Sequence, residues 1–497
     1  MPPLVETTSG PVCGVDGPDG VVAHLGIPYA APPTGELRFA APSPPPPWTA
    51  PLDATRFGPG APQSDENPMG DLVPGMQVSD TDEGSCLTLN VWTPGLDDHA
   101  RPVMVWLHGG AFSLGSSSLP VYDGARLARR GDVVVVSCNY RLGALGFLVV
   151  DGPGCTTNCG LRDQIAALQW VHHNIARFGG DPANVTIFGE SAGAGSVLSL
   201  LASPAARPWF TRAICQSGAT DLLLDLDRAA EVTATVARHA GVASDAASLR
   251  SLDADTLVRA QTAAALELAA TVGTMPFHPV VDGDLLPLTW PDALGAGHAA
   301  THPLLIGTTV DEMRLFVDML PGGPVASDAE LVGRLGYIGA PDPAALAGAY
   351  ERAQPSPATA DDRWWRALTD QSMWVPAMRL ADAHAAHQPS TFVYRFDWQA
   401  ADPRKRACHG LDIPFPFDTL DHDGWWDFVA DPDDARTLAH TIQDAWVAFA
   451  RTGVPSCDPV GDWPAHDAER RPTVILDQNV RVEHDPHGEV LRLWRTS

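Results

Sequence analysis

A short stretch near the middle of the chain constrains the fold more than any other part of the sequence. The β-branched and aromatic run at 185–188 indicates a buried strand, and a small-residue, Leu-rich segment with helical character follows. Between them lies Gly189-Glu190-Ser191-Ala192-Gly193. A Gly-x-Ser-x-Gly turn between a strand and a helix is typical of the elbow that raises a nucleophilic serine above the carboxyl edge of a sheet.

The two glycines of this turn have a steric role, since a side chain at Gly189 or Gly193 would crowd the neighbouring strand and helix. The helix that begins after Ser191 directs its positive end and its free N–H groups toward the place where an oxyanion would form. A bare Gly-x-Ser-x-Gly also occurs in ordinary Gly-rich turns. The strand–turn–helix setting favours a serine hydrolase.

Length and composition are compatible with a large globular enzyme. The 497 residues could form one large α/β domain with insertions or several domains of average size, and a hydrophobic content of 45% supports a substantial core. A formal net charge of −28 argues against a nucleic-acid partner, because phosphate contacts require clustered Lys and Arg. We attribute the acidity to solubility.

The sequence also argues against a membrane span, a leader and a metal site. No apolar run reaches the roughly 18 residues of a transmembrane helix, and the start Met-Pro-Pro-Leu-Val-Glu lacks the basic and apolar regions of a signal peptide. The eight cysteines match no zinc signature, and we expect Cys155 and Cys159 to be free thiols. The expectation is a cytoplasmic protein that needs no metal and no membrane.

The pattern of apolar segments predicts an α/β fold. Strands are predicted at 87–92, 103–107, 133–136, 185–188, 303–307, 391–396 and 473–476. Helices are predicted at 163–175, within 221–270, around Trp364, Trp365 and Trp374, and at 436–451. Apolar strands that alternate with helices imply a mostly parallel sheet covered on both faces. Because we find no internal repeat and no linker, we predict one domain over residues 1–497.

Two further segments are predicted to be irregular. Residues 1–62 have the pattern of short strands and turns, and the four prolines at 44–47 exclude a central strand or a helix interior there. Residues 62–84 are polar and acidic and are predicted to form a long loop, which in compact domains is often a lid or a pocket wall.

An activated serine needs a base within hydrogen-bond reach, and the base needs an acid that holds its tautomer. In a fold with this elbow the chain order is nucleophile, acid, histidine. Glu312 and His409 meet that order, and each follows a predicted strand. Asp311 is an equally placed acid on these grounds, whereas His422 and His440 do not follow a strand closely.

The tetrahedral intermediate of acyl transfer also needs amide donors that are already in place. The segment at 108–112, His-Gly-Gly-Ala-Phe, directly follows a predicted strand, and its small residues let the backbone approach a substrate. A tight Gly turn would have the same sequence, but its pairing with the serine elbow favours an oxyanion hole. The N–H of Ala192 would complete it.

Taken together, these motifs resemble those of the type B carboxylesterase family, which includes the cholinesterases and the bacterial p-nitrobenzyl esterases. The resemblance extends over nearly the whole chain. It is carried by the segments at 26–30, 37–39, 86–90, 108–112, 139–143, 179–182, 189–193, 216–218, 311–312, 407–409 and 449–453.

The resemblance implies an α/β-hydrolase fold without a metal or organic cofactor. It implies that Ser191 is the nucleophile, His409 the base, and Glu312 rather than Asp311 the acid. The family's oxyanion donors correspond to Gly110, Ala111 and Ala192.

The sequence departs from the family pattern at two points. Many relatives join the cysteine that matches Cys86 to one shortly upstream, but Ala61 stands in that place here, so the disulfide should be absent and the loop at 62–84 freer to move. The same loop has no tryptophan, whereas cholinesterases use one there to hold a quaternary ammonium. A choline ester is therefore a poor substrate prediction.

The function predicted from the sequence is a carboxylic-ester hydrolase that forms an acyl-enzyme on a small-molecule ester and acts as a monomer or weak homo-oligomer. Short-acyl or aryl esters suit an apolar pocket. The candidate walls of that pocket are Met69, Met76, Phe277, Phe316, Trp374 and Phe415. The alternatives are a non-catalytic cholinesterase-like binding protein, and an acyltransferase or amidase that uses the same triad.

Overall fold

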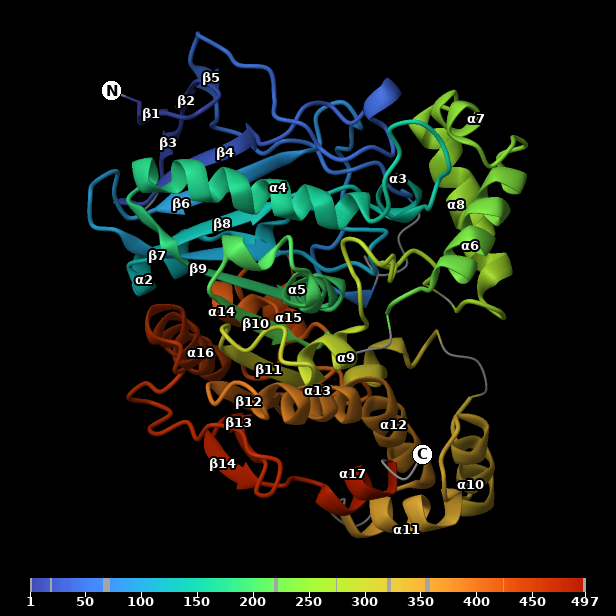
Figure 1. Cartoon of the computed structure of the whole chain (residues 1–497). Coiled ribbons are helices and arrows are strands. Elements are labelled where there is room, and N and C mark those ends of the chain that lie inside the picture. The colour runs from blue at the N-terminus through green and yellow to red at the C-terminus, as the bar shows by residue number, and fades with distance from the viewer. Residues whose placement is uncertain are drawn as a thin grey trace.

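A computed structural model of the chain describes residues 2–17, 20–65, 72–218, 222–273, 275–319, 323–353, 358–422 and 424–494. An eleven-stranded sheet runs through the molecule, in the order β14-β13-β12-β11-β10-β9-β7-β8-β6-β4-β3 (Figure 1). Its strands are β3 (Val15–Asp16), β4 (Val22–Pro28), β6 (Thr88–Thr93), β7 (Arg101–Leu107), β8 (Val134–Cys138), β9 (Gly180–Glu190), β10 (Arg212–Gln216), β11 (Leu304–Thr309), β12 (Thr391–Phe396), β13 (Pro472–Leu476) and β14 (Arg481–His484). A second, small sheet holds β1 (Leu4–Glu6), β2 (Pro11–Cys13) and β5 (Leu52–Asp53).

The helices cover both faces of the large sheet. Along the first two thirds of the chain they are α2 (Ala125–Gly131), α3 (Gly143–Phe147), α4 (Cys159–Asn174), α5 (Ala192–Ala202), α6 (Leu226–His239), α7 (Ala246–Arg250), α8 (Ala254–Leu268), α9 (Trp290–Gly295) and α10 (Asp328–Tyr337). The remaining helices are α11 (Pro343–Ala353), α12 (Ala360–Thr369), α13 (Val375–Ala385), α14 (Pro414–Phe417), α15 (Trp425–Phe428), α16 (Pro432–Thr452) and α17 (Gly488–Trp494). Helices α4, α5, α9 and α13 pack on one face, and α2, α14 and α16 pack on the other (Figure 1).

The alternation of side chains along the strands divides the interior into two cores. In β7, Val105 and Leu107 belong to the core under α4 and α5, whereas Met104 and Trp106 belong to the core under α16. Every residue of β7 is buried, because helices cover both of its sides. This is why the strand appears in the sequence as a continuous apolar run rather than an alternating one.

The direction of the strands confirms the predicted mostly parallel sheet. Among the described strands, the seven from β13 to β8 run parallel to their neighbours, whereas β14, β6, β4 and β3 pair antiparallel. At the end of β9, Gly189 pairs with Leu107 on one side and Cys215 on the other. The serine elbow therefore lies at the centre of the sheet.

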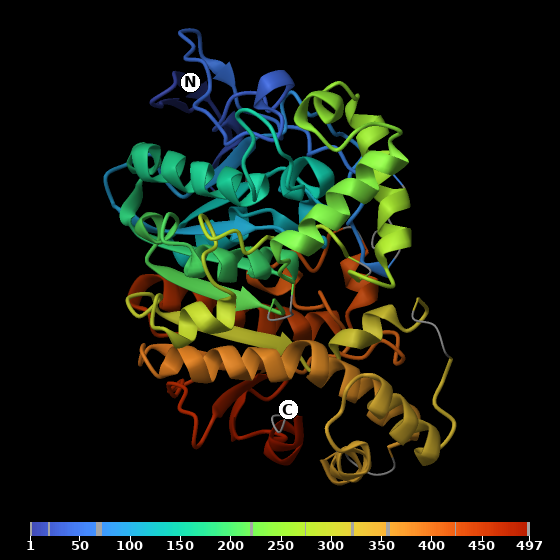
Figure 2. The ribbon, with the colours of Figure 1, turned by 45° about the vertical axis from the view of Figure 1, so that its right-hand side comes forward.

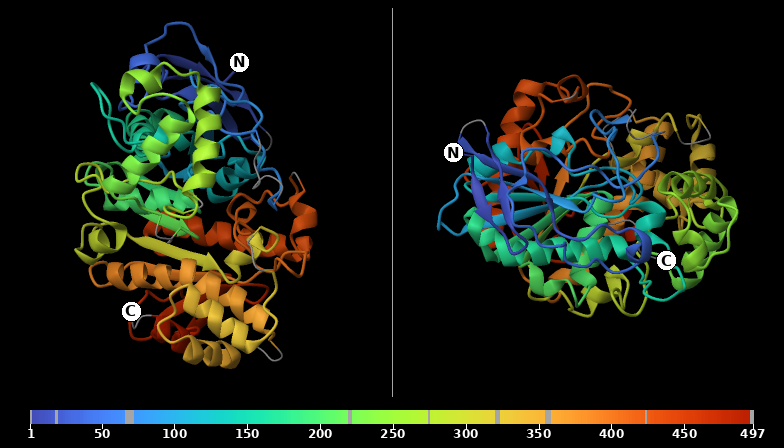
Figure 3. Two further views of the ribbon diagram at one scale, coloured as in Figure 1. Left: turned by 90° about the vertical axis from the view of Figure 1, so that its right-hand side faces the viewer. Right: turned by 90° about the horizontal axis from the view of Figure 1, so that it is seen from above.

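Helices inserted between the strands gather at the end of the sheet toward which β10 and β11 point. Figure 2 shows α6, α7 and α8 above that end, with α10 and α11 below it. The predicted helical segment within 221–270 is thus confirmed by α6, α7 and α8. The N-terminal strands and the C-terminal helix α17 lie at opposite ends of the molecule (Figure 3).

Several short elements were not predicted from the sequence, among them β10, β14 and α17. Strand β10 and the antiparallel edge strand β14 are short, with five and four residues, and α17 has seven. Such short segments carry less than two turns of helical periodicity or only two pairs of alternating positions. Their conformation depends on neighbours that lie far away in the chain.

Two polar residues at the start of α4 have structural roles. Asp163 accepts hydrogen bonds from the backbone N–H and the Nε of Arg141, at 3.0 and 2.8 Å, and the two side chains are 0% and 1% exposed. Arg162 instead forms an ion pair with Asp284 at the surface.

The cysteines and the segment at 62–84 agree with the sequence predictions of free thiols and an irregular loop. All eight cysteines are free thiols, and the buried Cys86 Sγ lies 3.6 Å from the carbonyl oxygen of Glu83. The described parts of 62–84 are largely irregular, as predicted, and Glu83 accepts a hydrogen bond from Arg38 Nε at 2.6 Å.

Within the described residues, no helix combines the length and the apolar character that a bilayer crossing requires.

Candidate active site

Ser191 occupies a strained turn between β9 and α5. Its backbone has φ 55° and ψ −123°, a conformation that non-glycine residues rarely adopt. A Cβ on Gly193 would lie 2.0 Å from the carbonyl oxygen of Leu107, and a Cβ on Gly189 would lie 2.7 Å from that same atom. The two glycines therefore allow strand, turn and helix to pack this closely, as the sequence predicted.

His409 and Glu312 meet at the carboxyl end of the sheet. The imidazole Nδ1 lies 2.6 Å from Glu312 Oε2, and the backbone N–H of His409 donates to the Glu312 carbonyl oxygen at 3.0 Å. The other carboxylate oxygen of Glu312 accepts the N–H of Thr309 at 2.8 Å. With exposures of 0% for Glu312 and 4% for His409, both groups are shielded from water, which strengthens their interaction.

Asp311, the rival acid, faces a different environment from Glu312. Its Oδ1 lies 3.7 Å from Nε of Arg314, and its side chain lines a cavity together with Arg366 and Arg406. The structure therefore brings Glu312, and not Asp311, to the imidazole. His172 and His173 are exposed on α4, and among the described residues the ion pairs of His422 and His440 are to Asp421 and Asp418.

A second carboxylate, which sequence reasoning missed, faces the other ring nitrogen of His409. Glu190 Oε1 lies 3.3 Å from His409 Nε2, and a Cβ on Gly109 would lie 3.0 Å from Glu190 Oε2 and 3.2 Å from the Cβ of Ser191. Glu190 is the first of the two variable positions in the Gly-x-Ser-x-Gly turn. The available signal was a charged residue at the buried end of an apolar strand, since such a group is rarely buried without a partner.

The carboxylates around His409 control its protonation. Burial acts to lower the pKa of His409, but the carboxylates of Glu190 and Glu312 outweigh it and raise that pKa to about 9. Burial raises the pKa of Glu190 to about 8. Behind them, burial raises the pKa of Asp412 to about 6, and its Oδ2 accepts a hydrogen bond from Gln216 at 3.0 Å. The imidazole thus lies in an acidic pocket that stabilises its positive form.

The loop after β7 presents backbone amides next to Ser191. Gly110 and Ala111 have φ values of 109° and 53°, and a Cβ on Gly110 would lie 2.2 Å from the carbonyl oxygen of Leu114. Tyr140 holds the loop, because its hydroxyl donates to the His108 carbonyl oxygen at 2.8 Å. Within the described chain, the N–H groups of Gly110, Ala111 and Ala192 donate no hydrogen bond, so all three remain available to a ligand.

Comparison with known proteins agrees with this arrangement. The model of the carboxylesterase family matches residues 1–494. This chain belongs to the carboxylesterase family. It is a carboxylic-ester hydrolase with the α/β-hydrolase fold, and its substrates are small-molecule esters.

Relatives of this carboxylesterase match it over nearly its whole length. The para-nitrobenzyl esterase of Bacillus subtilis is 40% identical over 98% of this chain and 97% of its own. The liver carboxylesterase of Sus scrofa is 34% identical over 99% of this chain and 92% of its own. A solved carboxylesterase from Geobacillus stearothermophilus has a TM-score of 0.87 and 38% identity, covering 99% of this chain and 100% of that one.

The predicted pocket residues of the carboxylesterase have different surroundings. The Phe316 ring lies 6.1 Å from the imidazole of His409, beside the acid–base pair. Met76, Phe277, Trp374 and Phe415 are buried within the two cores; for example, Phe415 packs edge-on against Phe396 at 4.8 Å. Met69 lies outside the described residues. That these six residues form the walls of the substrate pocket remains a prediction.

Proposed function

We propose that Ser191, His409 and Glu312 form the catalytic triad of this carboxylic-ester hydrolase. The observation that carries the proposal is the buried hydrogen bond between His409 Nδ1 and Glu312. The other ring nitrogen, Nε2, faces Glu190, which directly precedes Ser191 in the strained elbow. An acid bound to Nδ1 holds the proton there and leaves Nε2 as the base.

In the first half of the reaction, His409 Nε2 removes the proton of Ser191 Oγ while Oγ attacks the ester carbonyl carbon. The resulting imidazolium is stabilised by Glu312 and then gives its proton to the departing alcohol oxygen, leaving an acyl-enzyme. In the second half, His409 removes a proton from water, which attacks the acyl carbon, and returns it to Ser191 Oγ as the acid leaves.

The charge that develops on the carbonyl oxygen needs donors already in place. We assign this role to the N–H groups of Gly110, Ala111 and Ala192, which donate to no other described group. Ala192 is the first residue of α5, so the positive end of that helix adds to the stabilisation.

Proton transfer from Ser191 to His409 requires the serine hydroxyl to replace the Glu190 carboxylate as the partner of Nε2. Within the described part of the chain the Ser191 hydroxyl makes no hydrogen bond, so its rotation toward the imidazole breaks none. In enzymes without substrate the hydrogen bond between the nucleophile and its base is often long, and it shortens only in the substrate complex.

The substrates that we propose are esters with a short acyl group or an aryl alcohol. The Phe316 ring beside His409 offers an apolar contact at the reacting centre, and the para-nitrobenzyl esterase of B. subtilis acts, by its name, on a benzyl ester, whose alcohol carries an aromatic ring. A panel of p-nitrophenyl esters graded by acyl length tests this, with kcat/KM expected to fall as the chain grows.

The direct test of the triad is Ser191→Ala measured with p-nitrophenyl acetate. We expect kcat to fall by about 10⁴–10⁶-fold, because no other group supplies the attacking oxygen. Ser217→Ala is the matched control, since Ser217 has the same φ of 55° and is buried at the end of the neighbouring strand. Undiminished hydrolysis by the Ser191 variant contradicts the proposal.

We further propose a cytoplasmic location and a monomeric or weakly associated state. The eight free thiols suit a reducing compartment. Of the large apolar side chains in the described part of the chain, the two most exposed, Leu266 and Tyr337, lie on different helices rather than in one patch. Cell fractionation tests the location, and light scattering over a dilution series tests the association.

A further inference from the structure

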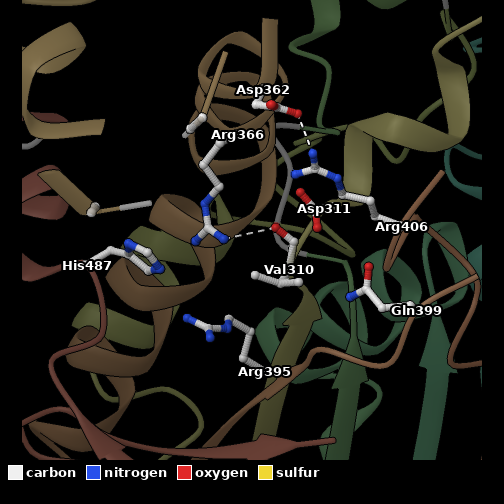
Figure 4. A pocket seen from close by; sticks show the side chains of 10 residues that line it. Val310, Asp311, Asp362, Arg366, Arg395, Gln399, Arg406 and His487 are labelled. Atoms are coloured by element: carbon white, nitrogen blue, oxygen red, sulfur yellow. Dashed lines mark hydrogen bonds and ion pairs between the residues drawn. The ribbon is translucent and has the colours of Figure 1, made fainter. Parts of the chain in front are cut away.

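A cavity of about 500 Å³ lies at the end of β11, and its lining includes Val310 and Asp311 but neither Glu312 nor His409 (Figure 4). It is therefore a different site from the one that holds the proposed triad. Its walls also carry Arg366 from α12 and Arg395 from β12, together with Arg406 and His487 from two loops.

The first two arginines are buried but incompletely paired. Arg366 is 4% exposed; its Nε donates to Asp370 at 2.9 Å and its Nη1 to the Val310 carbonyl oxygen at 3.0 Å. Arg395 is 5% exposed and donates through Nε and Nη2 to Asp397 at 2.7 and 2.6 Å. Within the described chain, the buried Nη2 of Arg366 and Nη1 of Arg395 have no hydrogen-bond partner.

A buried charged N–H group without an acceptor is costly, and two of them on separate elements at one cavity call for a ligand. Figure 4 shows both guanidinium groups and the His487 imidazole directed toward the same space. We propose that this cavity binds a small oxyanion, a carboxylate or a phosphate, whose oxygens accept hydrogen bonds from Arg366 Nη2 and Arg395 Nη1.

Guanidinium groups suit this role because their planar N–H donors match the geometry of carboxylate and phosphate oxygens. Asp397 occupies the Nε and Nη2 side of Arg395, and Asp370 occupies Nε of Arg366, so one outer nitrogen of each arginine remains for a ligand. These internal pairs hold the two guanidinium planes in place before any ligand arrives.

The positive charge of the cavity wall favours the binding of an anion. The charge of Arg366, burial and the charge of Arg395 together lower the pKa of His487 to about 2, so the field at this wall is positive. Burial raises the pKa of Asp311, and its carboxylate lies 3.7 Å from the guanidinium Nε of Arg314, which offsets its negative charge.

The size of the cavity favours an organic anion over a free inorganic ion. About 500 Å³ lies in the range of small-molecule sites, and a phosphate ion alone would leave much of it empty. The side chains of Val310 and Ala353 supply apolar wall next to the arginines. The proposed ligand is therefore a carboxylate or phosphate group attached to a compact organic group.

Calorimetric titration of the intact protein at constant ionic strength tests the proposal, with inorganic phosphate, phenyl phosphate and benzoate as probes. We expect saturable binding of one anion per chain, tighter for a probe with a ring than for inorganic phosphate. Stronger binding of phenyl phosphate than of benzoate identifies a phosphate ester, and the reverse order identifies a carboxylic acid. The absence of saturable binding of all three overturns the proposal.

The double variant Arg395→Gln/Asp397→Asn locates the site, because removing an ion pair as a unit leaves no buried charge without its partner. We expect affinity for the best probe to fall at least tenfold. Arg406→Gln gives a second cavity variant, in which Asp362 keeps its ion pair with Arg314. Arg130→Gln, at a surface ion pair with Asp444, is the control for loss of one positive charge and should bind normally.

Near-ultraviolet circular dichroism checks that each variant is folded. Undiminished binding by the folded cavity variants overturns the assignment. Should the double variant not fold, crystals soaked in tungstate decide the question, since its metal scatters anomalously. A peak between the guanidinium groups of Arg366 and Arg395 supports the proposal, and a cavity without one overturns it.

Discussion

Two histidines near the end of β11 lie in opposite electrostatic environments. His409 lies between the carboxylates of Glu190 and Glu312, and its pKa is raised to about 9 although burial acts to lower it. His487 lines the arginine cavity, where Arg366, burial and a second arginine lower its pKa to about 2. The same side chain is therefore stabilised as a cation in one place and as a neutral ring in the other.

This contrast shows that two adjacent residues at the end of one strand can belong to two sites of opposite charge. Asp311 and Glu312 are adjacent, yet the first lines the arginine cavity and the second binds the imidazole. The division follows from where β11 ends: Glu312 begins a 3₁₀ helix (η6, Glu312–Phe316), so the two side chains leave the backbone in different directions. Neighbours in sequence thus belong to different sites.

Among the effects that follow from this comparison, the largest separates these two acids. Glu312→Gln should lower kcat/KM for p-nitrophenyl acetate by about 10³–10⁴-fold, because an amide cannot hold the required tautomer or stabilise the imidazolium. Asp311→Asn should change it by less than about tenfold, since its side chain faces the arginines. Equal losses in the two variants would contradict the division of roles.

The next effect concerns the stability of the arginine cavity. Asp370→Asn leaves Arg366 as a buried charge without its carboxylate, and we expect the free energy of unfolding to fall by about 3–5 kcal/mol. Glu489→Gln is the control, because its ion pair with Arg352 is exposed and its loss should leave the urea midpoint unchanged. Urea denaturation measures both, and a normal midpoint for the Asp370 variant would show that Asp370 does not balance the charge of Arg366.

The smallest effect is a shift along the pH axis. A base must be neutral to accept a proton, so the raised pKa of His409 places the rise of kcat/KM above pH 6.5, with activity gained as pH increases. Glu190→Gln removes a negative charge 3.3 Å from Nε2, which favours the neutral ring. The midpoint should therefore move to lower pH by about one to two units.

The control for this shift is Asp412→Asn. Asp412 acts on the imidazole through charge alone and comes after Glu190 and Glu312 among the groups that raise its pKa, so its removal should move the midpoint less. The pH dependence of kcat/KM measures both variants. A midpoint that stays in place or rises in Glu190→Gln would show that Glu190 does not control the proton of His409.

Local patterns made much of the fold predictable. The apolar runs that became β7, β8 and β11 are continuous because helices cover both faces of the sheet, and that composition is visible without coordinates. The helical periodicity that became α4 and α16 is likewise local. Strands β10 and β14 escaped prediction because their pairing partners, and not their own few residues, determine them.

The sequence by itself determined the serine elbow and the small-residue loop after β7, because each depends on residues close together in the chain. The order of nucleophile, acid and histidine is also visible in the sequence, although Ser191, Glu312 and His409 lie far apart in it. Local pattern left Asp311 and Glu312 equally placed, the family resemblance favoured Glu312, and the structure brings Glu312 to His409. The tertiary structure alone decided that Glu190 faces Nε2 and that arginines from separate elements surround one cavity. The physical reason is that the direction of a side chain at a strand end, and the charges that it meets there, depend on elements tens to hundreds of residues away.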